Sequence, residues 1–483
     1  MPFPTATFAV FFVAAFTLNW LLRPHELLWR ATMVAVSLYF CAWVDVRFAL
    51  LLVASAAVNG LLANAAARAL DLGDPTPASR RCVAIAVVVD VAVLGLFAYH
   101  GFFLGSVTDV FDALGLSATA PTLGLLVPVG LSVVTLHAIG YVVDVGRGDV
   151  EPVAWGDVLL YLCFFPHLVA GPPVRVDELV PQFHERPDPR RVPATDAFVL
   201  IGAGLFKAVV IAGYLGSELV DPAFADPGAA SGGALAVALY AFAVQIYAGF
   251  SGLTDIAVGC ALLLGVEYPR PFDAPYVARS VREFWDRWNT PVSHWLRDYV
   301  YVPLGGNRGG RTTTYRNLAL TMVTGALWYG AGWPFVAWGA LHGAYLVGER
   351  AVATRFERGD GRGAPADAPS TLVGAVARWA VTFNLVVIAW AFYRAGSVGT
   401  AVEVLGRIAT LAPGDVALVP PLAVVIVVAA VAAQFAPPGL TLGLRARFTT
   451  LAPAAQVAVL ALVLTLVSAM GPDGTLPYAY LPF

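Results

Sequence analysis

Long apolar stretches separated by short polar connections run along almost the whole chain. A helix needs about 20 apolar residues to cross the hydrocarbon core of a bilayer, and most of these stretches reach or approach that length. We therefore predict an all-α polytopic transmembrane protein with about 11–13 spans. The first stretch lacks a basic leader and a small-residue cleavage site, so we expect a retained helix rather than a signal peptide. The stretches lie near residues 5–22, 28–44, 47–67, 83–105, 122–146, 197–217, 232–266, 315–330, 333–350, 371–394, 417–437 and 453–471.

Arginine is distributed unevenly among the connections between these stretches. Arginine-rich loops stay in the cytoplasm by the positive-inside rule, and this predicts an extracytoplasmic N-terminus. Two arginines, Arg394 and Arg407, fit this orientation poorly because they would lie outside. The predicted cytoplasmic loops are 68–81, 147–191, 270–316, 350–362 and 445–447, and the predicted outside loops, which carry acids and no arginine, are 106–120, 218–233 and 471–477.

Two short runs contain residues that interrupt helices. The run 164–174, FFPHLVAGPPV, holds three prolines and a glycine, and proline blocks continued helix because it lacks a backbone donor. The run 301–310, YVPLGGNRGG, ends its helix on glycines that tolerate positive φ. Irregular backbone survives at membrane depth only where protein or a water-filled cavity covers it. These runs therefore predict re-entrant segments beside a central cavity.

The composition supports a membrane protein and excludes several other classes. Hydrophobic residues make up 59% of the chain and charged residues only 13%, whereas a soluble domain carries about a quarter charged residues. The net charge of −3 argues against a nucleic-acid partner. The 4 cysteines are scattered singly, so the sequence predicts no disulfide framework and no metal site.

The segment 282–307, REFWDRWNTPVSHWLRDYVYVPLGGN, has the most distinctive chemistry of the chain. It sets three tryptophans among arginines, acids and a single histidine, between apolar stretches. Tryptophan favours the membrane boundary, where its ring can face hydrocarbon on one side and water on the other. We expect this segment to lie at the cytoplasmic boundary and to face the cavity.

A family resemblance rests on this segment and on several further blocks in the same order along the chain. The chain resembles the membrane-bound O-acyltransferases, in particular the branch with the membrane subunit of alginate O-acetyltransferase and the D-alanyl transferase of lipoteichoic acid. This resemblance implies an acyltransferase core over 1–350, a cytoplasmic linker loop over 351–370, and C-terminal transmembrane helices over 371–483 that complete the same domain. The further blocks are YVVDVGRG (141–148), FFPHLVAGPPVR (164–175), GLFKAVVIA (204–212), QIYAGFSGLTDIAVG (245–259), GALWYGAGW (325–333) and WGALHG (338–343).

The resemblance also implies an activity and its partners. A ring of tilted helices in the cell membrane would surround a thin partition between a cytoplasmic and an extracytoplasmic funnel. The protein would pass an acyl group, commonly acetyl, from a cytoplasmic thioester to a polysaccharide or another cell-envelope acceptor. We expect acyl-CoA or another acyl thioester as donor substrate, with no bound cofactor. Membrane lipid surrounds such a protein, and an extracytoplasmic acyltransferase often completes the transfer.

The family's catalytic histidines do not carry over directly. Its principal histidine sits in a Leu-Trp-His-Gly block that aligns with residues 327–330, where this chain has Tyr329. A second family histidine follows Arg-Trp, and the corresponding residue here is Asn289. His342 does match the family's Trp-x-x-x-His-Gly block, and His294 stands one helical turn before an aspartate that could orient its ring.

Acyl transfer to a hydroxyl needs a proton acceptor and a donor for the developing oxyanion. Our candidate catalytic residues are His342, as the best remaining proton acceptor, Tyr329, as a hydrogen-bond donor beside it, and His294. Each of these residues has a structural alternative, because a single histidine or tyrosine in an apolar helix is often simply hydrogen-bonded. Our candidate residues for binding the acyl-thioester donor are Arg282, Trp285, Trp288, Asn289 and Arg297.

Ionisable groups also lie inside the apolar stretches, among them Lys207 and Asp255. Burial of an unpaired charge is costly, so we expect these two residues to form an interhelical ion pair, to snorkel to an interface or to contact substrate. The family's acid before Phe-Ser-Gly is replaced here by Gly249. Two other functions stay open. A catalytically altered member could serve as a scaffold or acyl conduit, and broken helices with buried charges also occur in transporters, although we find no inverted repeat.

Overall fold

The computed structural model describes residues 3–71, 74–116, 124–128, 130–360 and 371–437, with short runs between 439 and 465. The described residues form helices, and their β-structure is limited to two isolated backbone bridges. The all-α prediction is therefore confirmed. Part of the predicted linker, 361–370, and most of the last apolar stretch lie outside the described residues.

The chain divides into two compact units. The first unit comprises residues 1–201 and 256–269, and the second comprises 202–255 and 270–482. The helices of the first unit are α1 (Ala6–Leu22), α2 (Glu26–Ala42), α3 (Val46–Arg68), α4 (Pro77–Leu94), the π-helix Gly95–Tyr99, α5 (His100–Ala113), α6 (Leu131–Arg147), α7 (Trp155–Cys163), α8 (Phe165–Leu168), α9 (Val176–His184), the 3₁₀ turn Pro189–Arg191, and most of α10 (Ala194–Leu205).

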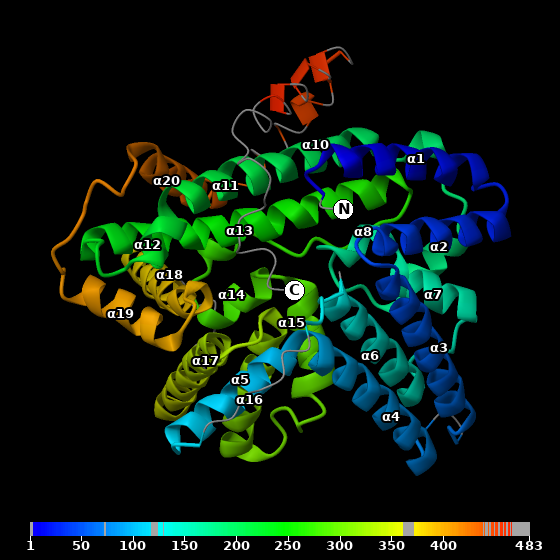
Figure 1. Cartoon of the computed structure of the whole chain (residues 1–483), viewed down its shortest axis with the longest axis horizontal. Coiled ribbons are helices and arrows are strands. Elements are labelled where there is room, and N and C mark those ends of the chain that lie inside the picture. The colour runs from blue at the N-terminus through cyan, green and yellow to red at the C-terminus, as the bar shows by residue number, and fades with distance from the viewer. Residues whose placement is uncertain are drawn as a thin grey trace. The chain divides into compact units, whose positions relative to one another are not determined.

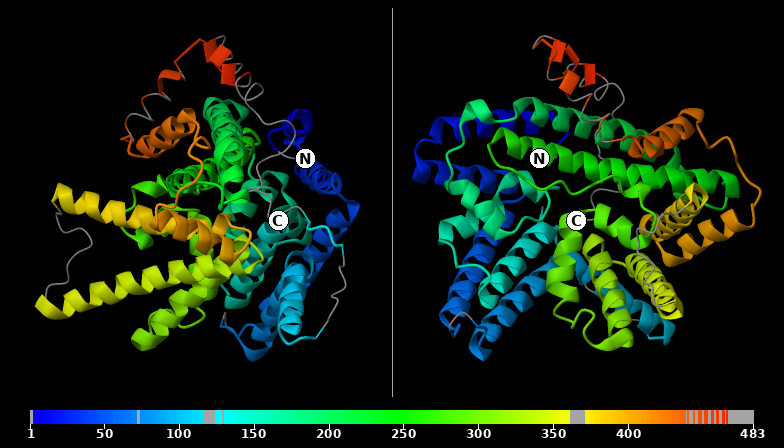
Figure 2. Two further views of the ribbon diagram at one scale, coloured as in Figure 1. Left: turned by 60° about the vertical axis from the view of Figure 1, so that its left-hand side comes forward. Right: turned by 180° about the vertical axis from the view of Figure 1, so that it is seen from behind.

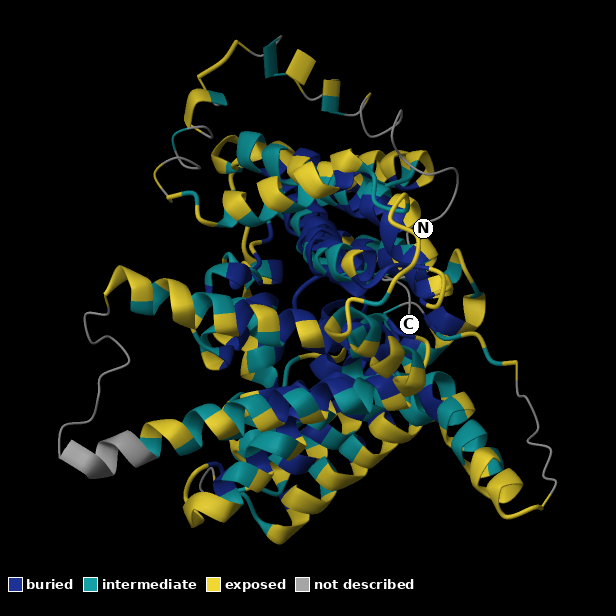
Figure 3. Ribbon diagram, turned by 90° about the vertical axis from the view of Figure 1, so that its left-hand side faces the viewer, coloured by how far each residue is buried: buried dark blue, intermediate teal, exposed yellow. Residues whose placement is uncertain are grey.

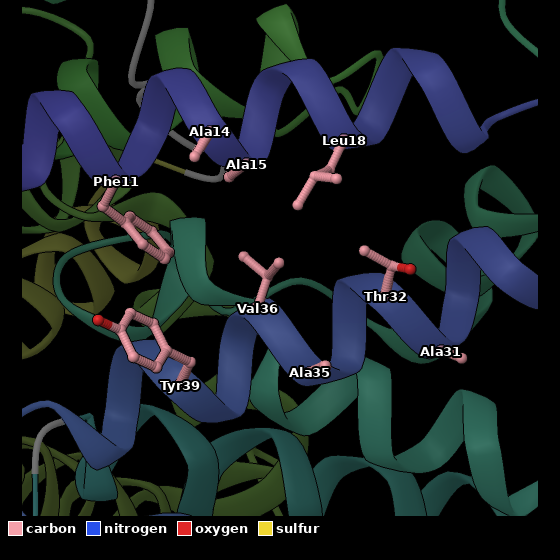
Figure 4. A pocket seen from close by; sticks show the side chains of 9 residues that line it. All are labelled: Phe11, Ala14, Ala15, Leu18, Ala31, Thr32, Ala35, Val36 and Tyr39. Atoms are coloured by element: carbon pink, nitrogen blue, oxygen red, sulfur yellow. The ribbon is translucent and has the colours of Figure 1, made fainter.

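In the first unit, α1 and α2 form a hairpin with an apolar groove between them. Figure 4 shows Leu18 of α1 and Val36 of α2 projecting into this groove. Farther along it, the rings of Phe11 and Tyr39 stack with their centroids 6.3 Å apart. The base of the hairpin is polar, because the indole N–H of Trp29 donates to the side-chain oxygen of Asn19 at 2.8 Å. Away from that base the groove has the apolar lining expected of a surface that contacts lipid.

Helices α3, α4 and α6 pack against one another in the same unit and lie together in Figure 1. Nearly every residue of α6 is buried. The interrupted run that follows is irregular, as predicted: α7 ends at Cys163, α8 has a single turn, and the chain then runs without helix to α9. Phe164 through Leu168 are fully buried. Protein side chains therefore cover this broken backbone.

The second unit contains the remaining helices. Its long element α13 is one uninterrupted helix, although the length of its apolar stretch allowed two segments. The helices are the π-helices Phe206–Ile211 and Gly216–Val220, α11 (Ala212–Leu215), α12 (Asp221–Ala225), most of α13 (Gly232–Leu263), the 3₁₀ turn Pro275–Val277, α14 (Val281–Arg287), α15 (Thr290–Leu296), the π-helix Arg297–Tyr301, α16 (Gly310–Tyr329), α17 (Trp333–Asp360), α18 (Leu372–Arg394), α19 (Val398–Ala409) and α20 (Pro421–Gln434).

Helices α16 and α17 form a closely packed hairpin, visible from two directions in Figures 1 and 2. Two glycines one turn apart on α17 allow this close approach. A Cβ atom at Gly339 would lie 2.5 Å from the Cβ of Ala326, and one at Gly343 would lie 3.0 Å from the Cα of Ala319. Small residues four apart are a common way to bring membrane helices together. This packing fixes the position of His342, which directly precedes Gly343.

Helix α18 packs on α17 with only its second half buried. Figure 3 shows exposed residues along the part of the α17–α18 pair nearest their connection. By contrast with the interrupted run of the first unit, residues 302–304, which begin the predicted break after Tyr301, are exposed. Of the two predicted breaks, only the first is buried.

Five helical segments of the described chain are long and apolar enough to cross a membrane. They are Val46–Arg68, Pro77–Ala113, Ala194–Ala225, Gly232–Leu263 and Leu372–Arg394, and Ala6–Leu22 and Pro421–Gln434 are shorter apolar helices. These segments support a multi-pass membrane protein. The predicted number of crossings, and the ring of helices around a central cavity, stay predictions.

Candidate active site

The α16–α17 hairpin positions two of the three predicted catalytic residues. Tyr329 is the last residue of α16, and the glycines at 330 and 332 separate it from the start of α17. His342 lies two and a half turns into α17. Both side chains are buried, and the indole ring of Trp338 contacts both, with its centroid 5.4 Å from the Tyr329 ring and 5.1 Å from the His342 ring. The break in the hairpin therefore brings Tyr329 and His342 against the same tryptophan ring.

The His342 ring is held by aromatic neighbours and by one hydrogen bond. The indole N–H of Trp285 donates to Nδ1 of His342 at 3.3 Å, and Phe284 lies parallel to the imidazole. An indole nitrogen can only donate, so Nδ1 must be the acceptor. In the neutral ring the proton then resides on Nε2. That nitrogen is buried and has no hydrogen-bond partner among the described residues.

Tyr329 and Asn289, the two residues that replace family histidines, contact each other. The side-chain amide of Asn289 donates to the Tyr329 hydroxyl at 3.3 Å. Asn289 precedes α15 in a left-handed conformation, with φ of 41°, which asparagine tolerates better than most residues. Since the Tyr329 oxygen accepts from Asn289, its own O–H remains available as a donor. The two departures from the family pattern thus form one hydrogen-bonded pair.

The rings of Tyr329, Trp338 and His342 belong to an aromatic cluster, which also contains Phe284, Trp285, Trp288, Trp390 and Tyr393. Several buried polar groups of this cluster have no hydrogen-bond partner among the described residues, among them Nε2 of His342, the indole N–H of Trp338 and the hydroxyl of Tyr393. These three side chains are adjacent, because the Trp338 ring contacts the rings of both other residues. Native proteins leave few buried polar groups unsatisfied, and several in one cluster favour a site that exchanges hydrogen bonds with a substrate or water.

The structure divides the residues predicted to bind the donor into two groups. Trp285 contacts His342, Asn289 bonds to Tyr329, and Trp288 packs against Phe284 and Trp390 of the aromatic cluster. The side chains of Arg282 and Arg297 are 81% and 57% exposed and lie outside it.

His294, the third predicted catalytic residue, is exposed, and its side chain makes no hydrogen bond or ion pair within the described chain. The carboxylate expected to orient its ring, Asp298, instead pairs with Arg297 at 2.8 Å. The structure therefore does not bring His294 to the other two candidates.

The sequence reasoning missed Glu349, which fixes the helix that carries Trp285. Its carboxylate accepts the backbone N–H of Val281 at 2.5 Å and that of Arg282 at 3.2 Å, at the first two positions of α14. Glu349 stands seven residues after His342, so both project from the same face of α17. One face of α17 therefore holds α14 at two points, through Glu349 and through the Trp285–His342 hydrogen bond. The seven-residue spacing was the only signal in the sequence.

Lys207 and Asp255 form an interhelical ion pair, which was one of their predicted roles. The ammonium group lies 2.6 Å from the Asp255 carboxylate and 3.0 Å from the Ser251 hydroxyl. Below it lies the ring of Tyr247, which in turn contacts Trp288 in the aromatic cluster. A single aromatic ring therefore separates this ion pair from the cluster.

Comparison with known proteins bears directly on this site. A profile of the membrane-bound O-acyltransferase family matches residues 146–362, which include Trp285, Tyr329 and His342. The chain is 38% identical to the probable alginate O-acetylase of Pseudomonas aeruginosa over 372 residues, or 75% of this chain and 66% of that protein. It is 36% identical to the probable alginate O-acetylase of Azotobacter vinelandii over 410 residues, or 83% of this chain and 76% of that protein.

The chain belongs to the membrane-bound O-acyltransferase family. A third relative, the peptidoglycan O-acetyltransferase of Helicobacter pylori, is 31% identical over 401 residues, or 77% of this chain and 72% of that protein. The resemblance found in the sequence blocks is thus confirmed. The protein is an O-acyltransferase and a multi-pass protein of the cell membrane.

Proposed function

We propose that this acyltransferase moves an acyl group, with acetyl as the expected one, from a cytoplasmic thioester to a hydroxyl of an extracytoplasmic polysaccharide or other envelope polymer. The names of its relatives, which act on alginate and on peptidoglycan, support the acceptor class. The positive-inside rule supports a cytoplasmic donor, because the arginine-rich segment 270–316 leads into the aromatic cluster. An acyl-CoA is the donor we expect, and a partner protein outside the cell could complete the transfer.

The observation that carries this proposal is the hydrogen bonding of His342: its Nδ1 accepts from Trp285, and its buried Nε2 has no partner among the described residues. The reaction joins the acceptor hydroxyl oxygen to the thioester carbonyl carbon and breaks the carbon–sulfur bond, while the hydroxyl proton passes to the leaving thiolate. Negative charge develops on the carbonyl oxygen in between. A buried donor aimed at that oxygen stabilises the transition state strongly, because no water screens the interaction.

The hydrogen bond from Trp285 changes the role that the sequence assigned to His342. With Nδ1 occupied as an acceptor, the neutral ring offers Nε2–H, which can donate to an oxyanion and cannot accept a proton. We therefore assign His342 to oxyanion stabilisation, with the indole N–H of Trp338 beside it as a second donor. The hydroxyl proton of Tyr329, whose ring also contacts Trp338, provides a third donor.

Two substitutions at His342 separate a donor role from a base role. Glutamine can place an N–H near the position of Nε2 but cannot exchange a proton at neutral pH. The measurement is the rate at which envelope polymer gains O-acetyl groups in cells that carry each variant as their only copy. This rate should fall about 10²–10³-fold for His342→Ala. His342→Gln should retain clearly more activity than His342→Ala.

The matched control is His294→Ala, which removes an exposed histidine from the neighbouring helix and should leave activity unchanged. Membrane levels of each variant, followed by immunoblot, distinguish lost chemistry from lost protein. Equal inactivity of His342→Gln and His342→Ala would restore the proton-acceptor role. Full activity of His342→Ala would refute the site and leave the family membership standing.

A further inference from the structure

A second polar site lies in the first unit, among helices α3, α4 and α6. The three helices enclose a cavity of about 100 Å³. Its wall is apolar except at three positions, Ser55 on α3, Asp90 on α4 and Thr135 on α6. Each helix therefore contributes one oxygen-bearing side chain to the same cavity. None of these residues belongs to the aromatic cluster around His342.

Asn59 holds the carboxylate of Asp90 in place. Its side-chain amide donates to one Asp90 oxygen at 3.0 Å and to the backbone carbonyl of Ser55 at 3.0 Å. Asn59 is fully buried and Asp90 is 6% exposed. The second carboxylate oxygen of Asp90 and the amide oxygen of Asn59 are both buried without a hydrogen-bond partner among the described residues. Two oxygen acceptors on hydrogen-bonded side chains are therefore buried and unsatisfied.

The charge of Asp90 also lacks a partner. Within the described chain no lysine, arginine or histidine forms an ion pair with it. Its nearest basic neighbours in sequence, Arg80 and Arg81, stand about 15 Å away along the helix, since each residue rises 1.5 Å. A bare carboxylate in apolar surroundings is strongly unfavourable, and an ionisable residue within a membrane helix is a functional site by default.

We propose that Asp90, held in place by Asn59, binds a monovalent metal cation together with Ser55 and Thr135, with Na⁺ as the best fit. All the available ligands are oxygens, which suit hard cations, and neither nitrogen nor sulfur ligands line the cavity. A single carboxylate neutralises one positive charge, whereas a divalent ion would leave a net charge in apolar surroundings. Thr135 donates its proton to the Leu131 carbonyl at 2.8 Å, so its oxygen lone pairs face outward as acceptors.

The Na⁺ site ties three helices together through one ion. Neutralisation of Asp90 by the ion should stabilise the folded chain as the Na⁺ concentration rises. Since α3, α4 and α6 pack against one another in the first unit, we expect the ion to stabilise this group of helices. The site is independent of the acyl-transfer chemistry, so its presence or absence can be judged without an activity assay.

The test is thermal unfolding of the purified full-length protein in detergent, in NaCl and in choline chloride at equal ionic strength. Once the site is half filled, each tenfold rise in Na⁺ should raise the midpoint by about 1–3 °C. Asp90→Asn, which keeps the shape and removes the charge, should abolish this difference between salts. Ser55→Ala should shift the half-effective Na⁺ concentration upward at least about threefold, since it removes one ligand.

The control is Asp109→Asn, which removes an exposed carboxylate from α5 and should keep the full Na⁺ response. Equilibrium dialysis with radioactive Na⁺ should show saturable binding to wild type and a loss of at least about tenfold in affinity for Asp90→Asn. Equal midpoints in NaCl and choline chloride for wild type would overturn the proposal. So would an undiminished Na⁺ response in Asp90→Asn.

Discussion

Replacement of Glu349 by alanine should loosen the helix that positions Trp285. In the structure its carboxylate accepts the first two backbone N–H groups of α14, a helix of 7 residues. The Ser280 hydroxyl caps the same end by accepting from the N–H of Glu283 at 2.9 Å, so Glu349→Ala still retains one capping hydrogen bond. Loss of one capping acceptor costs about 0.5–2 kcal/mol, and the interaction of a negative charge with the helix N-terminus adds about 0.3–1 kcal/mol. We expect a local loss of about 1–2 kcal/mol for Glu349→Ala.

Hydrogen exchange followed by mass spectrometry measures this local loss directly. A change of 1–2 kcal/mol should speed exchange of the α14 amides by about 5–30-fold, with peptides from the first unit unchanged. Acyl transfer should fall as well, because α14 carries the Trp285 that orients His342. Glu349→Gln, which keeps one acceptor, should lie between alanine and wild type, and Glu403→Ala, at an exposed glutamate of α19, should match wild type. Unchanged α14 exchange in Glu349→Ala would refute the argument.

Two further predictions concern charged pairs elsewhere in the chain. Lys207→Met should destabilise the protein by about 1–3 kcal/mol, measured by thermal unfolding. This is below the usual cost for a fully buried pair, because the two side chains are 23% and 27% exposed. The double variant Lys207→Met, Asp255→Asn should recover most of the lost stability. The hydrogen bond from His184 holds the pKa of Glu26 below its usual range. The contribution of the ionised Glu26 to stability is therefore present at neutral pH and is lost as pH falls below about 4.5. The unfolding midpoint of wild type should drop over this pH range, and the drop should be smaller in Glu26→Gln.

The fold class was predictable because membrane helices need long apolar runs. The same signal could not decide whether the stretch 232–266 forms one helix or two. Its length allows either, and the structure shows that α13 is continuous. A Cβ atom at Gly252 would lie 2.7 Å from the carbonyl oxygen of Gly204 and 2.8 Å from the backbone N of Ala208. The glycine serves close helix packing, which depends on a partner helix that local sequence does not reveal.

The candidate site was predictable in part, through the helical register of a few residues. The side chains of Trp285 and Trp288 point into the aromatic cluster, while Arg282 pairs with Asp286 one turn away on the exposed face of α14. From residue type alone, we assigned the arginines and the tryptophans to the same donor-binding site. In the structure the tryptophans occupy buried positions and the arginines occupy exposed ones. Glu349 could not be predicted as a capping residue, because 68 residues separate it from Val281.

The most direct test of the central claim uses inside-out membrane vesicles from cells that carry the chain. Radiolabelled acetyl-CoA is supplied at the exposed cytoplasmic face, and label in envelope polymer inside the vesicles is measured against vesicles without the chain. The account predicts chain-dependent labelling that His342→Ala nearly abolishes and His294→Ala leaves intact. No chain-dependent labelling with wild type, and none with Tyr329→His, would contradict the claim that this chain transfers acyl groups from a cytoplasmic thioester.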